Sequence, residues 1–174
     1  MKKIWYLFLF CLPLLACQDE SSQEIGVWIE PETSFVPILM DKSEMESSIG
    51  FLPARPVERP GKLYSFGPYI LLNERYQGLH IIDNSDRRNP RPVGFFRIPG
   101  NLDMAVKAGQ LYADNGTDLL VIDLFRPEAP QVVHRGRDVF PELPPPDLRS
   151  VPPAFSLASR PPNTVIVGWQ PNDQ

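Results

Sequence analysis

Acidic residues in the middle of the chain are the first candidates for chemistry. Residues 114–118 (Asp-Asn-Gly-Thr-Asp) place oxygen ligands around a glycine, as a calcium-binding loop does. They lack the full D-x-[DN]-x-[DN]-G pattern and its distal glutamate. Asn-Gly between two strand-like segments instead favours a tight hairpin turn, with Asn115 and Gly116 at its centre and positive φ at both. Asp103 and Asp114 would form a carboxylate pair only if folding brought them together.

The two histidines, His80 and His134, are the other groups suited to acid–base or metal chemistry. Each lies in or beside an apolar segment and has no second ligand close to it in the sequence. We therefore interpret both as structural residues. Neither Ser65 nor Ser85 lies in a nucleophile-elbow motif. The sequence thus predicts no catalytic residue, no cofactor and no metal site, and a protein that is not an enzyme.

Cys17 is the residue for which the sequence predicts a covalent modification. Lys2 and Lys3 precede an apolar segment, residues 4–15, which is shorter than the roughly 20 apolar residues of a membrane-spanning helix. Ala16 directly before Cys17 resembles the bacterial lipobox, in which the cysteine is acylated and becomes the new N-terminus. An ordinary secretory signal with a chance cysteine is the alternative. We expect Cys17 to carry the acyl chains that anchor the protein to a membrane.

The mature chain would keep a single cysteine, because Cys11 leaves with the signal peptide. No disulfide can then form, and an acylated Cys17 is not free for metal or thiol chemistry. Loss of Lys2 and Lys3 lowers the formal net charge from −4 by two, to −6, which argues against a nucleic-acid partner. Gln18 differs from the aspartate of an inner-membrane retention signal, and the acidic run after it resembles the surface-export signal of Bacteroidetes lipoproteins. This resemblance implies an outer-membrane lipoprotein on the periplasmic or cell-surface face, with the surface favoured.

The elements that must position these residues repeat after forty positions. Residues 78–83 (Gly-Leu-His-Ile-Ile-Asp) are similar to residues 118–123 (Asp-Leu-Leu-Val-Ile-Asp). A proline follows seven positions after the last aspartate of each segment. A period near 40 residues with several short strands per unit is typical of a β-propeller blade. Each aspartate ends a strand, where its carboxylate can accept backbone N–H groups of the next turn. The motif residues for which we expect a structural role are Leu79, Ile81, Ile82, Asp83 and Pro90, with Leu119, Val121, Ile122, Asp123 and Pro130 in the second repeat.

Each repeat contains four segments that we expect to be strands. The third segment is a continuous apolar run, as expected for a strand that is buried on both faces. The sequence therefore predicts an all-β fold with two four-stranded, propeller-like blades. The expected strands span residues 62–66, 69–73, 79–83 and 92–98 in the first repeat and residues 103–106, 110–113, 119–124 and 131–134 in the second.

The segments on either side of the repeats have a different character. Ser43 and Glu46 fit a capping box, with Ser43 as the N-cap of a short helix. Beyond residue 140 the prolines exclude a helix or a central strand, and only residues 164–169 could form an isolated or edge strand. We expect the rest of the tail to be irregular, extended and exposed. The expected organisation is a lipoprotein signal peptide (1–16), a lipidated cysteine with a flexible tether (17–34), an adaptor with a short helix (35–60), two blades (61–100 and 101–140) and a Pro-rich tail (141–174).

Residues 119–123 (Leu-Leu-Val-Ile-Asp) resemble the namesake string of the LVIVD repeat. The resemblance covers roughly residues 35–140, with residues 37–40 similar to the adaptor and residues 100–106 similar to a junction between blades. That family comprises bacterial and archaeal surface proteins whose repeats are expected to form β-propeller blades. The resemblance implies a short or truncated member of Bacteroidetes type, in which a lipobox leads through an adaptor into blades. Longer relatives continue with further blades, so we expect an incomplete, open propeller here.

The function that these observations favour is that of a lipid-anchored cell-envelope protein whose blades form a non-enzymatic interaction module. We expect the membrane as a partner through the acyl chains, and a protein or glycan partner at blade loops or sheet edges. We also expect self-association through open sheet edges, and no nucleic acid. Two alternatives stay open. One is a truncated remnant of a longer propeller lipoprotein without independent function, and the other is a propeller-scaffolded hydrolase or lyase fragment.

Overall fold

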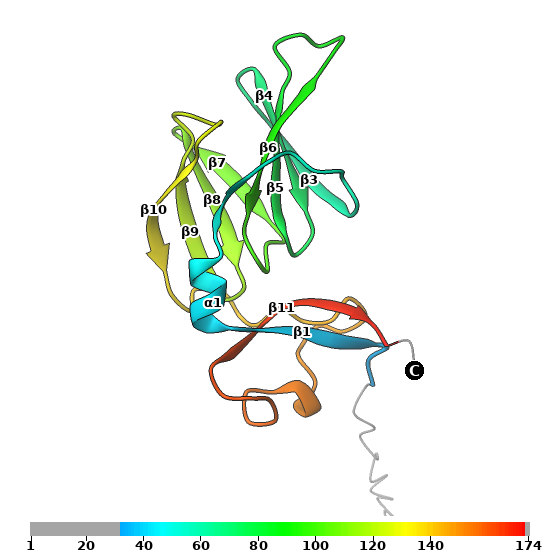
Figure 1. The fold of residues 1–174 in the computed structure, drawn as a ribbon. Coiled ribbons are helices and arrows are strands. Elements are labelled where there is room, and N and C mark those ends of the chain that lie inside the picture. The colour runs from blue at the N-terminus through cyan, green and yellow to red at the C-terminus, as the bar shows by residue number, and fades with distance from the viewer. Residues whose placement is uncertain (1–31, 173–174) are drawn as a thin grey trace, which may run out of the picture.

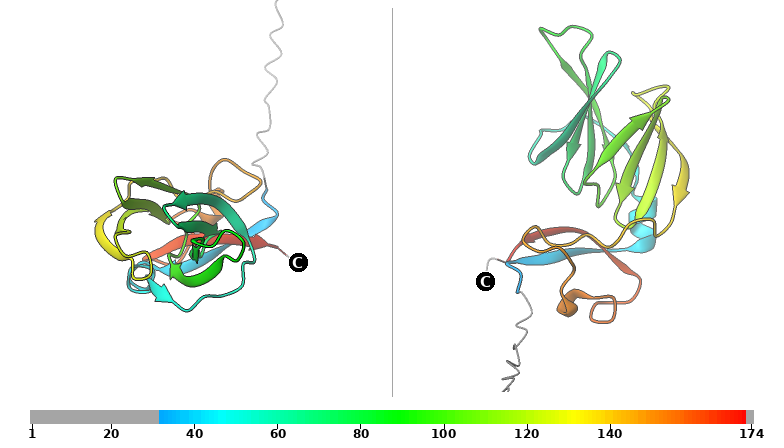
Figure 2. Two further views of the ribbon diagram at one scale, coloured as in Figure 1. Left: turned by 90° about the horizontal axis from the view of Figure 1, so that it is seen from above. Right: turned by 180° about the vertical axis from the view of Figure 1, so that it is seen from behind.

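The chain folds into three antiparallel β-sheets, none of them closed, in a computed structural model that describes residues 32–172 (Figure 1). The predicted all-β class is therefore confirmed. Two sheets stand side by side, and the third lies across one end of both (Figure 2). The predictions for the signal peptide (1–16), for Cys17 and for most of the tether (17–34) fall outside the described residues.

The first sheet contains the four strands of the first repeat and one strand from the adaptor, in the order β2-β6-β5-β4-β3. Its central strand β5 is the continuous apolar run of the repeat. Leu79 and Ile81 are each 1% exposed and His80 between them is 4% exposed, so both faces of this strand are buried. The strands are β2 (Gly50–Leu52), β3 (Pro60–Phe66), β4 (Tyr69–Glu74), β5 (Gly78–Asp83) and β6 (Arg91–Arg97).

The second sheet contains the four strands of the second repeat in the order β10-β9-β8-β7. The equivalent turns after β5 and β9 are stabilised in the same way. Asp83 Oδ1 accepts the N–H of Ser85 at 2.9 Å, and Asp123 Oδ1 accepts the N–H of Phe125 at 2.8 Å. In the described part of the chain, no strand pairs with the outer edge of β10. The strands are β7 (Met104–Lys107), β8 (Gln110–Asn115), β9 (Asp118–Asp123) and β10 (Gln131–Gly136).

The two repeat sheets pack against each other through opposite faces of their equivalent strands. Leu79 and Ile81 of β5 share one apolar core with Leu120 and Ile122 of β9. A shift of forty residues places Ile81 on Val121, so the core-facing positions of the two strands differ by one residue. Because successive side chains of a strand point to opposite faces, this offset means that one face of the first sheet packs on the opposite face of the second, as in sheets stacked in the same orientation.

The C-terminal segment forms a strand where the sequence allows one, at residues 164–169, but the rest of the tail is less exposed than the sequence predicts, with Leu143 only 7% exposed. β11 (Thr164–Pro171) pairs antiparallel with β1 (Phe35–Asp41) to form the third sheet. Trp169 is 2% exposed and donates its indole N–H to the carbonyl oxygen of Leu143 at 3.0 Å. Its ring also meets the ring of Phe155, in a short 3-10 helix, at a centroid distance of 5.7 Å. The prolines prevent regular structure between these residues, but the apolar side chains that they separate still bury together.

The predicted adaptor helix is present as α1 (Lys42–Ser47), but its N-cap is Asp41 and not Ser43. Asp41 Oδ1 accepts the backbone N–H groups of Ser43 at 2.8 Å and Glu44 at 3.2 Å. An aspartate caps as well as a serine, and Asp41 is the last residue of β1, where the chain still has the extended conformation that an N-cap needs. The fully buried Met45 packs against β11 and joins the helix to the third sheet.

The β8–β9 turn also differs from its prediction. Asn115 pairs with Asp118, so the two central residues are Gly116 and Thr117, and of these only Gly116 has a positive φ, of 62°. Asn115 is instead a buried strand residue whose Nδ2 donates to the carbonyl oxygen of Pro99 at 2.6 Å. This tertiary hydrogen bond favours the strand position of Asn115 over a position at the centre of the turn.

Asn101 connects the two repeats at the base of the sheets. It is fully buried, and its Oδ1 accepts Asn73 Nδ2 at 2.5 Å while its Nδ2 donates to Asp114 Oδ1 at 2.6 Å. Its backbone carbonyl also accepts the N–H of Tyr76 at 2.7 Å. Gly100 beside it has a φ of 78°, and a Cβ there would lie 2.7 Å from a backbone nitrogen of the β8–β9 turn. These contacts fix the ends of both sheets relative to each other.

Candidate binding site

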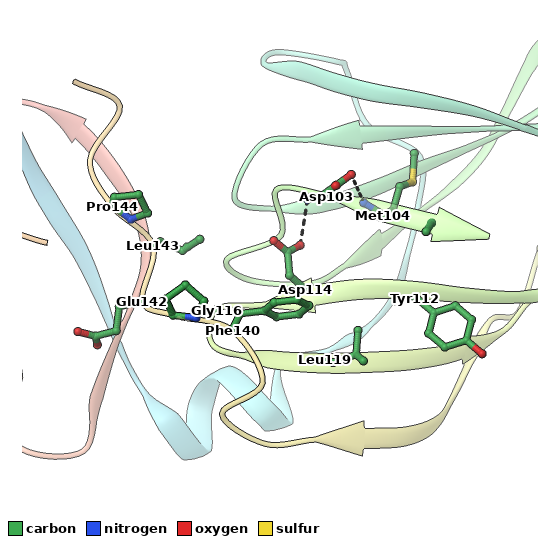
Figure 3. Close-up of a pocket in the computed structure, with 12 residues that line it drawn as sticks. Asp103, Met104, Tyr112, Asp114, Gly116, Leu119, Phe140, Glu142, Leu143 and Pro144 are labelled. Atoms are coloured by element: carbon green, nitrogen blue, oxygen red, sulfur yellow. Dashed lines mark hydrogen bonds between the residues drawn. The ribbon is translucent and has the colours of Figure 1, made fainter. Parts of the chain in front are cut away.

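A cavity of about 410 Å³ opens on the outer face of the second sheet, which is turned away from the first sheet (Figure 3). Tyr112 of β8 and Leu119 of β9 contribute to its floor, because they alternate with the residues that face the core. Phe140 and the segment 141–144 form the facing wall. The lining is mostly apolar, and two carboxylates lie at one end of the cavity.

The outer face of the first sheet, which is turned away from the second sheet, is already covered by the adaptor. β2 pairs with β6 and places Leu52 opposite Phe95 on this face. The guanidinium of Arg55 stacks 4.4 Å above the ring centroid of Phe95. Residues 58 and 59 donate their backbone N–H groups to the buried carboxylate of Glu74. Among residues 32–172, the second sheet has no such cover over its outer face apart from the segment 139–144, so a ligand can reach this face.

The segment that walls the cavity is held at several points. The N–H of Phe140 donates to the carbonyl oxygen of Thr117 at 2.9 Å, and the indole of Trp169 binds the carbonyl of Leu143. Glu142 forms an ion pair with Arg160, which is 9% exposed. The cavity therefore has a fixed wall, although Phe140 keeps 39% of its surface exposed. Exposed apolar surface at the mouth of a cavity is a feature of binding sites.

The fold brings Asp103 and Asp114 together at one end of the cavity. Asp114 Oδ1 accepts hydrogen bonds from Asn101 Nδ2 at 2.6 Å and from the backbone N–H groups of Leu102 and Asp103 at 2.9 and 3.0 Å. Burial raises the pKa of Asp114, and these hydrogen bonds oppose the rise. A hydrogen bond from Lys62 Nζ, at 2.8 Å, lowers the pKa of Asp103. The two pKa values shift in opposite directions, but both carboxylates are engaged in contacts that stabilise the fold.

Residues 114–118 do not form a cation loop. Arg135 Nη1 lies 2.7 Å from Asp118 Oδ2 and 2.8 Å from Asn115 Oδ1, so an arginine supplies the positive charge for these oxygen atoms. Asp118 is fully buried, and its second oxygen accepts the N–H of Asp138 at 3.1 Å. Within residues 32–172, no group of three or more His, Cys, Asp or Glu side chains is placed to hold a metal ion.

The two histidines lie in different sheets, and neither lines the cavity. His80 is buried in β5, with its Nε2 2.9 Å from Glu74 Oε2 and its ring 4.9 Å from that of Phe95. Burial opposes ionisation of Glu74, but the hydrogen bonds from His80 and from two backbone N–H groups lower the pKa of Glu74. His134 lies exposed on the edge strand β10. The structure therefore assembles no histidine–carboxylate pair in the cavity.

The repeat-motif residues occupy strands and turns, and of them only Leu119 lines the cavity. Phe140 and Leu143 were missed by reasoning from the sequence, because the segment around them has no periodicity. The signal that could have found them is the presence of three large apolar residues, Val139, Phe140 and Leu143, in a segment with prolines at 141 and 144. The structure places Leu79, Ile81 and Ile122 in the core, Ile82 and Val121 beside them in the central strands, Asp83 and Asp123 at strand ends, and Pro90 and Pro130 before β6 and β10.

Comparisons of the chain with protein-family models, with curated proteins and with solved structures give no match. The class of the protein is therefore defined by its own geometry, as an open all-β protein with an apolar cavity on one uncovered sheet face. The described helices include none that is long and apolar enough to cross a membrane.

Proposed function

We propose that this protein is a lipid-anchored binding module of the bacterial cell envelope. Two propeller-like blades of the LVIVD type would present the cavity of the second sheet to a protein or glycan partner. The observation that carries the proposal is the uncovered apolar cavity beside Tyr112, Leu119 and Phe140, on a face whose counterpart in the first sheet is closed by the adaptor.

The blade interpretation is supported by the repeated architecture. Each repeat forms four consecutive antiparallel strands, and the two sheets bury opposite faces of equivalent strands against each other. Successive blades of a propeller pack in this way, because each blade has one neighbour on each face. A further blade that packed on the second sheet as the second sheet packs on the first would cover the outer face of the second sheet. In this protein that face instead carries the cavity.

The chemistry of the cavity favours a ligand group with an apolar face. The rings of Tyr112 and Phe140 can stack on an aromatic side chain or on the apolar face of a sugar. The edge of β10 offers a second mode of recognition, because Val132 and Val133 are 40% and 53% exposed and the strand has a free outer edge within the described chain. A partner strand, or β10 of a second copy, could pair there by β-augmentation.

The cavity proposal is tested by nuclear magnetic resonance on the acyl-free chain from Gln18 onward. Indole serves as the probe for an aromatic side chain, and methyl β-glucoside as the probe for a sugar. We expect one of the two probes to shift the amide signals of Tyr112, Leu119 and Phe140, and a Leu119→Asn variant to lose these shifts. Val132→Asn, at an exposed site outside the cavity, is the matched control. The proposal fails if neither probe perturbs these three residues.

The anchoring proposal is tested separately in cells. Radiolabelled palmitate should label the full chain and not its Cys17→Ser variant, and added protease should degrade the labelled protein on intact cells if it faces the surface. Self-association is tested by light scattering of the acyl-free chain over a range of concentrations. A compact monomer at every concentration would refute pairing through the β10 edge and leave the cavity proposal untouched.

A glycoside hydrolase is the second candidate function, and one observation favours it. Asp103 and Asp114 lie together in a cavity, with pKa values shifted in opposite directions, as an acid and its partner require. Asp114→Asn keeps an oxygen that can accept the same three hydrogen bonds but removes the acid. Turnover of aryl glycosides by the wild type and its loss in this variant would support the hydrolase. Equal rates with both proteins would exclude it.

A further inference from the structure

A second cavity, of about 340 Å³, lies where the first sheet, the adaptor and the third sheet meet. Four arginines line it, and its lining contains no carboxylate. Such a concentration of positive charge contrasts with the formal net charge of −4 for the whole chain. The arginines come from the adaptor, from the β4–β5 turn and from the end of β6, namely Arg55, Arg59, Arg75 and Arg97.

Within the described part of the chain, no carboxylate forms an ion pair with any of these four arginines, and none of the four has a carboxylate oxygen within 4 Å. The nearby Glu74 forms no ion pair with them: its buried carboxylate lies against His80 and accepts hydrogen bonds from the backbone N–H groups of residues 58 and 59.

The fold holds these like charges close together. The backbone N–H of Arg75 donates to the carbonyl oxygen of Arg59 at 3.0 Å, so the two residues are neighbours. Burial raises the pKa of Tyr76, and the charges of Arg75 and Arg59 oppose this rise, so both guanidinium groups act on the same hydroxyl. Arg55 is held separately, by Gln77 Oε1 and by the ring of Phe95.

The β4–β5 turn, residues 75–77, lines this cavity and has a constrained backbone. Tyr76 has a φ of 67°, which is uncommon for a residue with a side chain. It is kept there by its N–H bond to Asn101 and by Gly168, where a Cβ would lie 2.9 Å from the Tyr76 ring. Strained backbone that the surrounding structure maintains is found most often at functional sites.

The apolar part of the lining, which includes Met40, Leu52 and Val167, completes a cavity with one charged and one apolar side.

We propose that this cavity binds a phosphate monoester that carries an apolar substituent. Guanidinium groups match phosphate oxygens in bidentate geometry, and four cations without a carboxylate favour a dianion over a monocarboxylate. The phosphate lies among the arginines and the substituent lies on Met40 and Leu52. The site is separate from the cavity of the second sheet and does not depend on the function proposed for that cavity.

Phenyl phosphate is the probe for this site, and titration calorimetry on the acyl-free chain from Gln18 onward is the assay. We expect phenyl phosphate to bind more tightly than inorganic phosphate, and benzyl alcohol not to bind. In the double variant Arg59→Gln/Arg75→Gln, binding of phenyl phosphate should weaken by roughly tenfold or more at low ionic strength, because two charged donors are lost. Both arginines are exposed, so the variant is expected to fold.

The matched control is Arg87→Gln/Arg88→Gln, which removes the same charge from an exposed turn outside both cavities described above. This control should change the affinity less than twofold. Equal weakening in both double variants would show that only net charge matters and would overturn the proposal. Absence of binding at millimolar phenyl phosphate would also overturn it. Without ligand, the Arg59/Arg75 variant should be no less stable than the wild type, because repulsion between like charges is relieved.

The phosphate could belong to a soluble metabolite or to a lipid headgroup, and sedimentation with vesicles distinguishes these sources. Phosphatidylcholine vesicles with and without phosphatidic acid are mixed with the wild type and with the Arg59→Gln/Arg75→Gln variant. Binding that requires both phosphatidic acid and the two arginines supports the site with a lipid ligand. Binding of phenyl phosphate without vesicle binding supports the site with a soluble ligand. Vesicle binding that is equal for both proteins, without phenyl phosphate binding, refutes it.

Discussion

Replacing Trp169 by phenylalanine is expected to destabilise the whole protein, although the sequence marks residues 164–169 only as a possible isolated or edge strand. The side chain is 2% exposed, its N–H donates to the carbonyl of Leu143 at 3.0 Å, and its ring meets that of Phe155. Phenylalanine keeps one aromatic ring but cannot donate the hydrogen bond. The substitution therefore tests whether β11 and the segment around Leu143 belong to the cooperative fold.

The expected loss can be worked out from these contacts. Leaving the buried carbonyl of Leu143 without a partner costs about 1–3 kcal/mol. Weakening the edge-on contact with Phe155 adds about 0.5–1.5 kcal/mol. Together they lower the free energy of unfolding by about 2–4 kcal/mol, a large part of the 5–15 kcal/mol that is typical of a folded domain. With a urea dependence of about 2 kcal/mol per molar, the midpoint falls by about 1–2 M.

The measurement is urea unfolding of the acyl-free chain from Gln18 onward, followed by far-ultraviolet circular dichroism. Fluorescence of the buried Trp169, measured in a Trp28→Phe background because Trp28 would otherwise also emit, should report the same midpoint, since the third sheet packs against the ends of both repeat sheets. Phe125→Leu is the matched control, because Phe125 is 85% exposed and its replacement should change the free energy by less than about 0.5 kcal/mol.

Two results would refute this reasoning. In the first, Trp169→Phe shifts the midpoint no more than Phe125→Leu does, which would mean that Trp169 does not hold the third sheet in place. In the second, the fluorescence and dichroism midpoints of the Trp28→Phe protein separate, which would mean that β1 and β11 unfold independently of the repeat sheets.

Three further substitutions test the core, the cavity and the backbone, each by urea unfolding. Leu120→Ala, fully buried between the sheets, should cost about 2–5 kcal/mol, whereas Leu157→Ala, 69% exposed, should cost almost nothing; similar losses would contradict the shared core. Burial raises the pKa of Asp114 above its ordinary value of 3.8, so protonation of this residue stabilises the folded state at low pH, and this stabilisation is lost as the pH rises through the raised pKa. Asp114→Asn should not show this loss of stability. If the stability of the wild type and of the variant changed in parallel with pH, the role of Asp114 would be contradicted. Gly78→Ala, with φ at 137° and a Cβ position 2.1 Å from a carbonyl oxygen of β6, should destabilise more than Gly67→Ala, where no atom lies within 4 Å; the reverse order would contradict the strand register.

Much of the fold could be predicted because it follows from local patterns. The forty-residue repeat predicted the strands of both repeats, since a short, β-branched apolar run bounded by turn residues favours a buried strand over a helix. The ends of β5 and β9 were also predictable, because Asp83 and Asp123 accept N–H groups only two residues ahead. Such contacts depend on neighbours in the sequence and not on the rest of the fold.

The errors share a different origin. The sequence offered Ser43 as an N-cap and Asn115-Gly116 as a turn, and both patterns are sound locally. Asp41 caps the helix instead, because β1 delivers the chain to it in an extended conformation. Asn115 stays in its strand, because its amide binds the carbonyl of Pro99, sixteen positions away. In each case a long-range contact selected between two local options of similar energy.

The sequence by itself determined the all-β class, the repeat and its strands, and the prediction that Cys17 is acylated, because each of these depends on residue type and short spacing. Only the tertiary structure decided where binding can occur. The first sheet is covered by the adaptor and the second is not, and the Pro-rich segment folds back to form one wall of a cavity. The four arginines of the second cavity likewise come from three separate elements, and no local pattern connects them. The physical reason is that burial and charge proximity depend on packing between segments that lie far apart in the chain.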